Sequence, residues 1–167
     1  MKYKHFTNEN EITEFVTTYY WDFVHNNFSQ SQRDNILSTE SAGRTDNDYL
    51  NNGEHLLCVF NDVIRCFNDI PGTPFDIIAY RSGDMLLRQG NEKRSFYSVS
   101  LLKNIVDEKY ATEEFPTTIL HIKKGSKIIP LQAFNERCDV GDAELLIWIP
   151  NVKKKGWLST NYIYSKT

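Results

Sequence analysis

The sequence predicts an α+β fold in which helices come first and short, mostly antiparallel strands follow. Before Pro74, apolar side chains recur at the three- to four-residue spacing of helices. After Pro74, short apolar runs alternate with turn-forming residues, as strands do. The connections between these runs are short, which favours antiparallel pairing because parallel strands need a long crossover. A run of helices followed by a run of strands is typical of an α+β domain.

Two helices are expected in the N-terminal part. The apolar positions of residues 8–28 form one helical stripe, with Thr7 or Asn8 as its candidate N-cap. Residues 29–53 are rich in Ser, Asn, Asp and Gly, which predicts a loop with room for one short helix. Residues 54–70 form a second apolar stripe, which a proline–glycine pair ends.

Strands are expected in the remainder of the chain. The candidate runs are residues 75–81, 95–100, 117–123, 127–133, 143–149 and 157–164. For residues 101–110 the sequence does not distinguish a short helix from a loop. No repeat, low-complexity tract or linker divides the sequence, so one domain spanning residues 1–167 is expected.

The composition is that of an ordinary globular protein. Hydrophobic residues make up 40% of the 167 residues and charged residues 25%. The net charge of −3 gives no basic field that would favour nucleic acid. No apolar run approaches the roughly 18 residues of a membrane span. The N-terminus is basic but lacks the apolar core of a secretory signal, so a cytoplasmic location is expected where the chain is made.

The cysteines and histidines show no metal or disulfide pattern. Three cysteines without CxxC spacing argue against a disulfide framework and a zinc site. Cys58 and Cys66 lie eight residues apart in an expected helix, so both are expected to face the core. The four histidines lack ligand spacing, and neither a Rossmann fingerprint nor a P-loop is present. No metal is therefore expected.

Three polar motifs adjoin the strand-like runs in a fixed order. Arg81 ends the first run, Ser98 and Ser100 lie in the second, and Glu144 begins an apolar run further on. A guanidinium offers two parallel donors to phosphate or ribose oxygens, and serines two apart in a strand share one face. A fixed carboxylate stabilises positive charge that develops beside it. Taken singly, each motif is more often ordinary surface.

Together the motifs resemble the Arg-Ser-Glu class of mono-ADP-ribosyltransferases, which includes clostridial binary-toxin enzymes, C3-like exoenzymes and phage-encoded transferases. The family pattern is an aromatic-Arg strand end, then Phe-x-Ser-Thr-Ser-Leu, then Glu-x-Glu before an apolar strand. Here the motifs read Tyr80-Arg81, Phe96-Tyr97-Ser98-Val99-Ser100-Leu101 and Asp142-Ala143-Glu144. A Lys-Gly-Ser turn at residues 124–126 is a fourth match. The resemblance covers roughly residues 75–150 and implies a core of two mostly antiparallel sheets with a cleft between them.

The resemblance implies an enzyme that uses NAD as a co-substrate. Arg81 would bind NAD, and backbone groups of Ser82 and Gly83 would hold the nicotinamide amide at close approach. Ser100 would line the cofactor side of the same cleft. Flanking side chains that could touch phosphate or adenine, but that are more often solvated surface, are Arg88, Arg94, Tyr97, Lys103, Lys109 and Tyr110.

The same resemblance assigns the catalytic roles. Ser98 would hydrogen-bond and orient Glu144, which would stabilise the cationic ribose as the glycosidic bond breaks. Asp142 departs from the family, which has Glu there in arginine-modifying members and Gln in members that modify Asn or Rho-type proteins. A strand would place Asp142 beside Glu144, with the charge to orient or deprotonate an acceptor but one methylene less reach. Residues 135–141 are the expected recognition turn, with Phe134 at its edge.

The leading prediction is a mono-ADP-ribosyltransferase that passes ADP-ribose to a macromolecular acceptor, with a host-cell protein favoured. A phage-encoded enzyme, an effector or a toxin fits this resemblance. Two alternatives stay open: an NAD glycohydrolase with water as the acceptor, and an inactive relative that acts as a binding module. The short side chain of Asp142 is the feature that favours the last. The target, the modified atom and the oligomeric state remain open.

Overall fold

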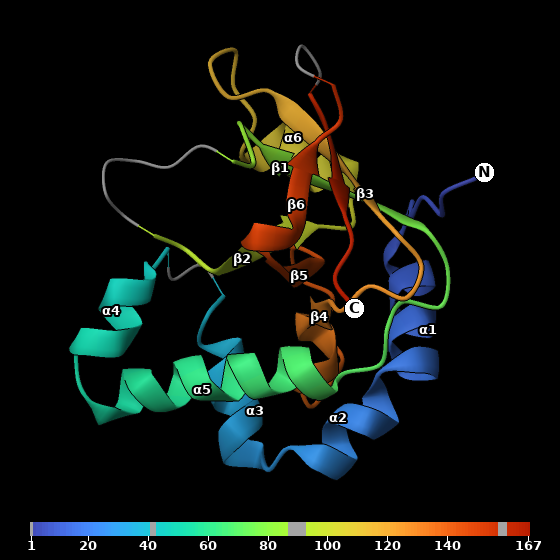
Figure 1. Ribbon diagram of the computed structural model, residues 1–167. Helices are drawn as coiled ribbons and strands as arrows, with labels where there is room; N and C mark the ends of the chain where they lie inside the picture. Colours follow the sequence, from blue (N-terminus) through green and yellow to red (C-terminus); the bar gives the residue numbers. More distant parts are fainter. Residues whose placement is uncertain (1, 41–42, 87–92, 157–159) are drawn as a thin grey trace.

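The computed structural model describes residues 2–40, 43–86, 93–156 and 160–167 (Figure 1). In these residues five helices come first: α1 (Glu9–Tyr19), α2 (Trp21–Asn27), α3 (Gln30–Leu37), α4 (Asp46–Asn51) and α5 (Glu54–Asp69). The strands that follow are β1 (Ile77–Ser82), β2 (Phe96–Ser100), β3 (Thr117–Ile122), β4 (Ile129–Pro130), β5 (Glu144–Trp148), β6 (Val152–Lys154) and β7 (Asn161–Tyr164). Helix α6 (Lys103–Lys109) lies between β2 and β3. The predicted α+β fold is confirmed.

The described strands form one seven-stranded sheet in the order β4-β5-β2-β1-β3-β7-β6. The β3–β7 pair is parallel and the other pairs are antiparallel, which confirms the mostly antiparallel prediction. The expectation of two separate sheets is wrong. Tyr80 of β1 lies opposite Ser100 of β2, and this short pairing joins the two halves into one sheet.

The expected helix over residues 8–28 is divided into α1 and α2. Asn8 is the N-cap of α1, and its side chain accepts a hydrogen bond from the backbone N–H of Glu11 at 3.0 Å. Tyr20 leaves helical backbone at φ −128° and ψ −29°. Its ring is buried edge-on against Phe15, with 5.4 Å between ring centroids. The burial of Tyr20 therefore accompanies a break that periodicity alone did not predict.

Residues 29–53 contain two helices, although the sequence predicts a loop with at most one. Each helix begins with a capping box, formed by Ser29 with Gln32 in α3 and by Thr45 with Asp48 in α4. In both boxes the side chains and backbone N–H groups of the two residues bond reciprocally. The residues that cap helices are those that enrich loops, so composition concealed both helices.

Helix α5 follows the prediction for residues 54–70 closely, but one of its two cysteines does not face the core as predicted. Cys66 is buried and Cys58 is exposed, so the expectation that both face the core is wrong. Eight residues of α-helix turn by about 80° more than two full turns, which moves Cys58 off the apolar face.

The C-terminal strands are shorter than the sequence predicts. Only Ile129 and Pro130 of the expected run 127–133 pair as a strand, because proline has no N–H to continue the ladder. The chain then forms a 3₁₀ helix, η1 (Leu131–Phe134). In the expected run 157–164, β7 begins at Asn161, and residues 157–159 lie outside the described ranges. Strand β6, an edge strand rich in lysine, was not predicted.

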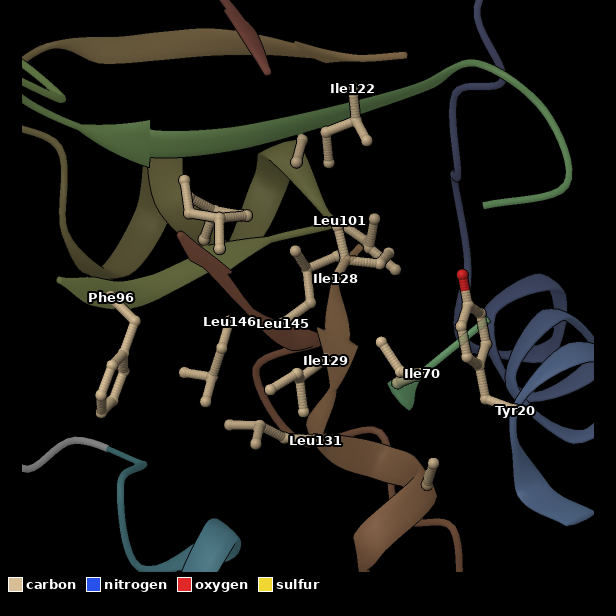
Figure 2. Close-up of a cluster of buried hydrophobic side chains, with 14 of the residues drawn as sticks. Tyr20, Ile70, Phe96, Leu101, Ile122, Ile128, Ile129, Leu131, Leu145 and Leu146 are labelled. Atoms are coloured by element: carbon tan, nitrogen blue, oxygen red, sulfur yellow. The ribbon is translucent and has the colours of Figure 1, made fainter. Parts of the chain in front are cut away.

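The core lies where the helices meet the sheet. Figure 2 shows buried side chains that converge from β5, β4, η1 and the α1–α2 junction, among them Leu145, Leu146, Ile129, Leu131 and Tyr20. In Figure 1, α2, α3 and α5 lie together on the side of β4, whereas α6 lies near β1 and β3. Of the helices in the described ranges, none has the length and apolarity to cross a membrane.

Candidate active site

A cavity of about 340 Å³ opens beside β1, β2 and β5. Its volume lies within the range of roughly 300–1,000 Å³ that is usual for small-molecule sites. Six of the seven residues singled out by the motifs line it: Arg81, Ser82, Ser98, Ser100, Asp142 and Glu144. The wall opposite the strands comes from the N-terminal half and from α6 with its C-cap, through Thr39, Gly43, Arg44, Tyr49, Val106 and Tyr110. The cavity thus lies between the sheet and helical elements, and not between two sheets as expected.

Strand pairing brings Ser98 to Glu144. In the β2–β5 register, Ser100 lies opposite Glu144 and Ser98 opposite Leu146, so Ser98 and Glu144 are diagonal neighbours. The hydroxyl of Ser98 donates a hydrogen bond to Oε1 of Glu144 at 3.2 Å. Leu145, the next residue, is fully buried and anchors the start of β5 in the core. The carboxylate is therefore held by a rigid element.

The surroundings of Glu144 disfavour its charged form. Burial, first, and the negative charge of Glu40, second, raise the pKa of the Glu144 carboxyl to about 7, while the hydrogen bond from Ser98 opposes the rise. Asp142 adds a smaller upward contribution. The second oxygen, Oε2, is buried and has no hydrogen-bond partner among the described residues. A buried polar atom without a partner is unusual and marks Glu144 as a functional candidate.

Arg81 is connected to the same strand as Ser98. Its Nη1 donates to the carbonyl oxygen of Ser98 at 2.5 Å, and its guanidinium carbon lies 4.0 Å from the ring centroid of Tyr97. Burial lowers the pKa of Arg81, but an arginine keeps its charge at neutral pH. The backbone carbonyl of Arg81 accepts a hydrogen bond from Thr118 Oγ1 at 2.9 Å. Arg81, Ser98 and Glu144 thus form one hydrogen-bonded chain.

The other residues expected to bind a cofactor differ in their placement. Ser82 lines the cavity, whereas Gly83 does not. Gly83 lies in a turn at φ 81°, and a Cβ there would approach Phe115 to 3.3 Å, so turn geometry accounts for this glycine. The Ser100 hydroxyl faces the cavity wall but donates to the carbonyl oxygen of Asp142 at 2.7 Å. Ser100 therefore holds the residue that lies two positions before Glu144.

Each carboxylate oxygen of Asp142 accepts one hydrogen bond. Lys109 Nζ lies 2.6 Å from Oδ1, and Tyr110 Oη donates to Oδ2 at 2.6 Å. These hydrogen bonds lower the pKa of Asp142, and the bond to Asp142 raises the pKa of Tyr110 to about 12. We call Lys109, Tyr110 and Asp142 the α6 clasp. Strand alternation does not place Asp142 beside Glu144, because β5 begins at Glu144 and Ala143 has a positive φ of 55°.

Sequence reasoning missed the cavity wall from the N-terminal half. Thr39, Gly43, Arg44 and Tyr49 line the cavity, and all come from the segment predicted as loop. The signal that would have found it is the capping box at the start of α4.

Two further guanidinium groups lie on this wall. Arg44 lies 5.8 Å from the ring centroid of Tyr49, and Arg94 Nη2 donates to the carbonyl oxygen of Gly43 at 3.0 Å. The wall is fastened to β2 because the carboxylate of Asp46 accepts bonds from the backbone and hydroxyl of Ser95, at 2.8 and 2.5 Å. Together with Arg81, the wall presents three arginines to the cavity. Arg88, a weaker candidate, lies outside the described residues.

The expected recognition turn at residues 135–141 precedes the clasp. Phe134, predicted at its edge, is 1% exposed and belongs to the core. Cys138 and Gly141 both have φ 52°, so the turn contains two left-handed positions. Within the described ranges, no group of three or more His, Cys, Asp or Glu side chains is placed to hold a metal ion.

No family model matches the chain, and no curated protein matches it. Solved structures do. A C3-type ADP-ribosyltransferase from Clostridium botulinum matches with a TM-score of 0.63 at 14% identity, over 99% of this chain and 98% of that one. An ADP-ribosyltransferase toxin from Paenibacillus larvae matches with a TM-score of 0.63 at 13% identity, over 98% of each chain. The fold is that of the C3-like ADP-ribosyltransferases.

The C3-like fold accounts for more of the chain than the motifs do. The structure of a C3-type enzyme from S. aureus with NAD also matches, with a TM-score of 0.57 at 13% identity, over 99% of this chain and 97% of that one. The motifs span residues 75–150, whereas these matches include the N-terminal helices. The α+β fold implied by the motifs is confirmed, with one sheet in place of the expected two.

Proposed function

We propose that the chain is a mono-ADP-ribosyltransferase that cleaves NAD and transfers ADP-ribose to a macromolecular acceptor. The observation that carries this proposal is the connected set of Arg81, Ser98 and Glu144 on one cavity wall. Arg81 bonds the Ser98 carbonyl at 2.5 Å, and the Ser98 hydroxyl bonds Glu144 at 3.2 Å. A cation, a hydroxyl and a carboxylate in this arrangement suit a ligand that carries phosphates at one end and a reactive ribose at the other.

The cavity lining fits NAD. Arg44, Arg81 and Arg94 offer guanidinium donors suited to its two phosphates. Tyr49 of α4 and Tyr97 of β2 also line the cavity and supply aromatic surface. The matched S. aureus structure is a complex with NAD, and Exoenzyme S from Pseudomonas aeruginosa, matched with a TM-score of 0.53, is bound to carba-NAD. These features support NAD as the co-substrate.

The proposed reaction breaks the bond between the ribose C1′ and the nicotinamide nitrogen, and the electron pair leaves with nicotinamide. Positive charge then develops on the ribose, where an ionised Glu144 stabilises it. Oε1 of Glu144 is held by Ser98, which orients the carboxylate beside the cavity. The acceptor forms a bond to C1′ and loses a proton. Glu144 therefore acts in its charged form, which its surroundings disfavour.

Water as the acceptor is the second candidate. The family resemblance gives Asp142 the role of orienting the acceptor. Both oxygens of Asp142 are bonded within the α6 clasp. An engaged Asp142 favours an acceptor that does not need this carboxylate, and water is the simplest one. The two candidates share the cleavage of NAD and differ only in the species that attacks C1′.

The test is to incubate the purified chain with NAD and measure nicotinamide release, free ADP-ribose and labelled protein in parallel. Lysates of candidate host cells supply the protein acceptors, and mass spectrometry locates the modified residue. Nicotinamide release with labelled protein supports transfer, and release with only free ADP-ribose supports the glycohydrolase. No nicotinamide release in the presence or absence of lysate contradicts both and leaves a binding module.

A further inference from the structure

The α6 clasp joins two segments that are distant in the sequence and that both border the cavity. Asp142 accepts one hydrogen bond on each carboxylate oxygen, from Lys109 and from Tyr110, both at 2.6 Å. Tyr110 and Asp142 line the cavity. The Asp142 side chain is 22% exposed, although it lies next to a surface turn. The acidic group is thus covered by its own protein.

The backbone around the clasp is held as firmly as its side chains. The Ser100 hydroxyl donates to the carbonyl oxygen of Asp142 at 2.7 Å, and the N–H of Leu101 donates to the carbonyl oxygen of Ala143 at 3.0 Å. On the other side, Val106 of α6 is 3% exposed and packs against the sheet. Both segments are anchored through their backbones, and the Lys109 side chain that bonds Asp142 is itself 55% exposed.

We propose that Lys109 and Tyr110 determine acceptor specificity by occupying one bonding position on each oxygen of Asp142, so that a guanidinium acceptor is excluded from this carboxylate. The inference rests on the proposed function and deepens it by naming the acceptor class. The acceptor reacts through a neutral nucleophile, such as a hydroxyl, thiol, amide or water. Lys109 takes the place beside Asp142 that an arginine side chain would need.

Two physical reasons support the exclusion. A guanidinium binds a carboxylate best through two parallel hydrogen bonds, which require both oxygens. In this chain an incoming guanidinium would have to displace Tyr110 from one oxygen and Lys109 from the other. It would also place a second positive charge beside the Lys109 ammonium, where like charges repel. The tethered lysine competes at a far higher effective concentration than a free acceptor.

The short side chain at position 142 suits this arrangement. A glutamate would carry its carboxylate about 1.5 Å further along the chain, which exceeds the tolerance of 2.6 Å contacts to two anchored donors. Asp142 is therefore matched to the clasp, and its departure from the family pattern has a structural reason. A role in the clasp replaces the expectation that Asp142 itself receives the acceptor.

The chain provides a matched control for Lys109 on the same helix. Lys103 lies 2.6 Å from Asp107, four residues along α6, and this pair does not line the cavity. Lys103→Met and Lys109→Met therefore remove the same charge from one helix and retain the hydrocarbon stem. Only the second substitution opens an oxygen of Asp142.

The test is a nuclear magnetic resonance titration of the NAD-free protein with ethylguanidinium chloride at constant ionic strength, followed at the backbone amide of Asp142. The wild type and Lys103→Met should show no saturable shift there. The Lys109→Met/Tyr110→Phe double variant should bind ethylguanidinium at least about tenfold more tightly than the wild type. Equal binding by the wild type and the double variant overturns the proposal. The proposal is also overturned if Lys103→Met tightens the saturable binding of ethylguanidinium as much as the double variant does.

A second measurement follows transfer from NAD to ethylguanidine, normalised to nicotinamide release. Lys109→Met should raise this ratio at least about tenfold and Lys103→Met should leave it unchanged. The proposed exclusion is overturned if the wild type labels ethylguanidine to the same extent as Lys109→Met. If the wild type releases no nicotinamide, the proposed function fails, while the binding titration still decides whether the clasp excludes a guanidinium.

Discussion

The two carboxylates at the mouth of the cavity lie two residues apart and have opposite surroundings. Glu144 is held by a single serine hydroxyl, has one buried oxygen without a partner among the described residues, and has its pKa raised to about 7 by burial and by Glu40. Asp142 is bonded by Lys109 and Tyr110, which lower its pKa. The difference shows that the partners of a carboxylate, and not its type or spacing, decide whether its pKa is raised or lowered.

The contrast has a backbone cause. Glu144 opens β5 and is fixed beside Ser98 by strand pairing. Ala143 has φ 55°, a conformation that few non-glycine residues adopt, and the Asp142 side chain is bonded by Lys109 and Tyr110 while only its backbone carbonyl is bonded from β2. One left-handed residue therefore separates the two environments.

Glu144→Gln should give the largest effect, because it removes the charge proposed to stabilise the ribose while keeping the shape. Nicotinamide release should fall by about 100–1,000-fold or more, with NAD affinity by calorimetry largely retained. The matched change Asp142→Asn should cost far less. Near-normal NAD turnover in Glu144→Gln would show that Glu144 is not the catalytic carboxylate and that the two carboxylates do not differ in function.

Arg81→Lys should weaken NAD binding by about 10–100-fold, because lysine cannot reproduce the paired donors of a guanidinium and a hydrogen bond to a charged group contributes about 1.5–3 kcal/mol. Calorimetry with NAD measures the loss. Arg65→Lys, in a surface pair with Asp69, serves as the control and should bind NAD as the wild type does. An unchanged affinity in Arg81→Lys would place NAD elsewhere.

Stability should respond to the two carboxylates with opposite signs. The raised pKa of Glu144 means that folding opposes its ionisation, so its cost appears as pH rises from about 4.5 and is complete above about 7. Glu144→Gln should therefore stabilise the fold at pH 8 by about 1–2 kcal/mol, allowing for partial solvation, and have little effect at pH 4.

Asp142, with its lowered pKa, contributes stability at neutral pH that is lost on acidification. Asp142→Asn should therefore destabilise the fold at pH 8. Urea unfolding of both variants at pH 4 and pH 8 measures the two signs. Destabilisation of the same size in both variants at pH 8 would contradict the proposed difference in environment.

Glu40→Gln should give the smallest effect. Nicotinamide release should increase with pH through about 7 as Glu144 ionises. Removing the charge of Glu40 lowers the pKa of Glu144, so the acid limb of the kcat profile should move to lower pH by a fraction of a unit. Glu9→Gln, at the start of α1, is the control. An identical acid limb in wild type and Glu40→Gln would show that Glu40 does not act on Glu144.

Much of the architecture was readable from local patterns. The 3.6-residue stripe predicted α5 almost to its ends, and short apolar runs predicted β1, β2, β3 and β5. Patterns failed where one residue changed the path of the chain. Tyr20 divided the first helix, and Pro130 ended β4 after two residues. Capping residues in 29–53 were mistaken for loop, because the same side chains serve both purposes.

The sequence by itself determined the order of the motifs and the identity of the candidate set. Arg81, Ser98 and Glu144 were identified from residue type and position next to apolar runs, and the structure brings them to one cavity. Strand pairing explains this common location, because residues at corresponding ends of neighbouring strands are brought together whatever the details of the loops.

Only the tertiary structure decided how each group is tuned. Lys109 and Tyr110 reach Asp142 from a helix 32 or 33 residues away, and Glu40 acts on Glu144 from the N-terminal half. Arg44 joins the wall because α4 is fastened to β2. Charge interactions and hydrogen bonds depend on distances between segments that no local pattern encodes. Periodicity therefore predicts which faces are buried, and the packing of distant segments sets which carboxylate has a lowered pKa and which has a raised one.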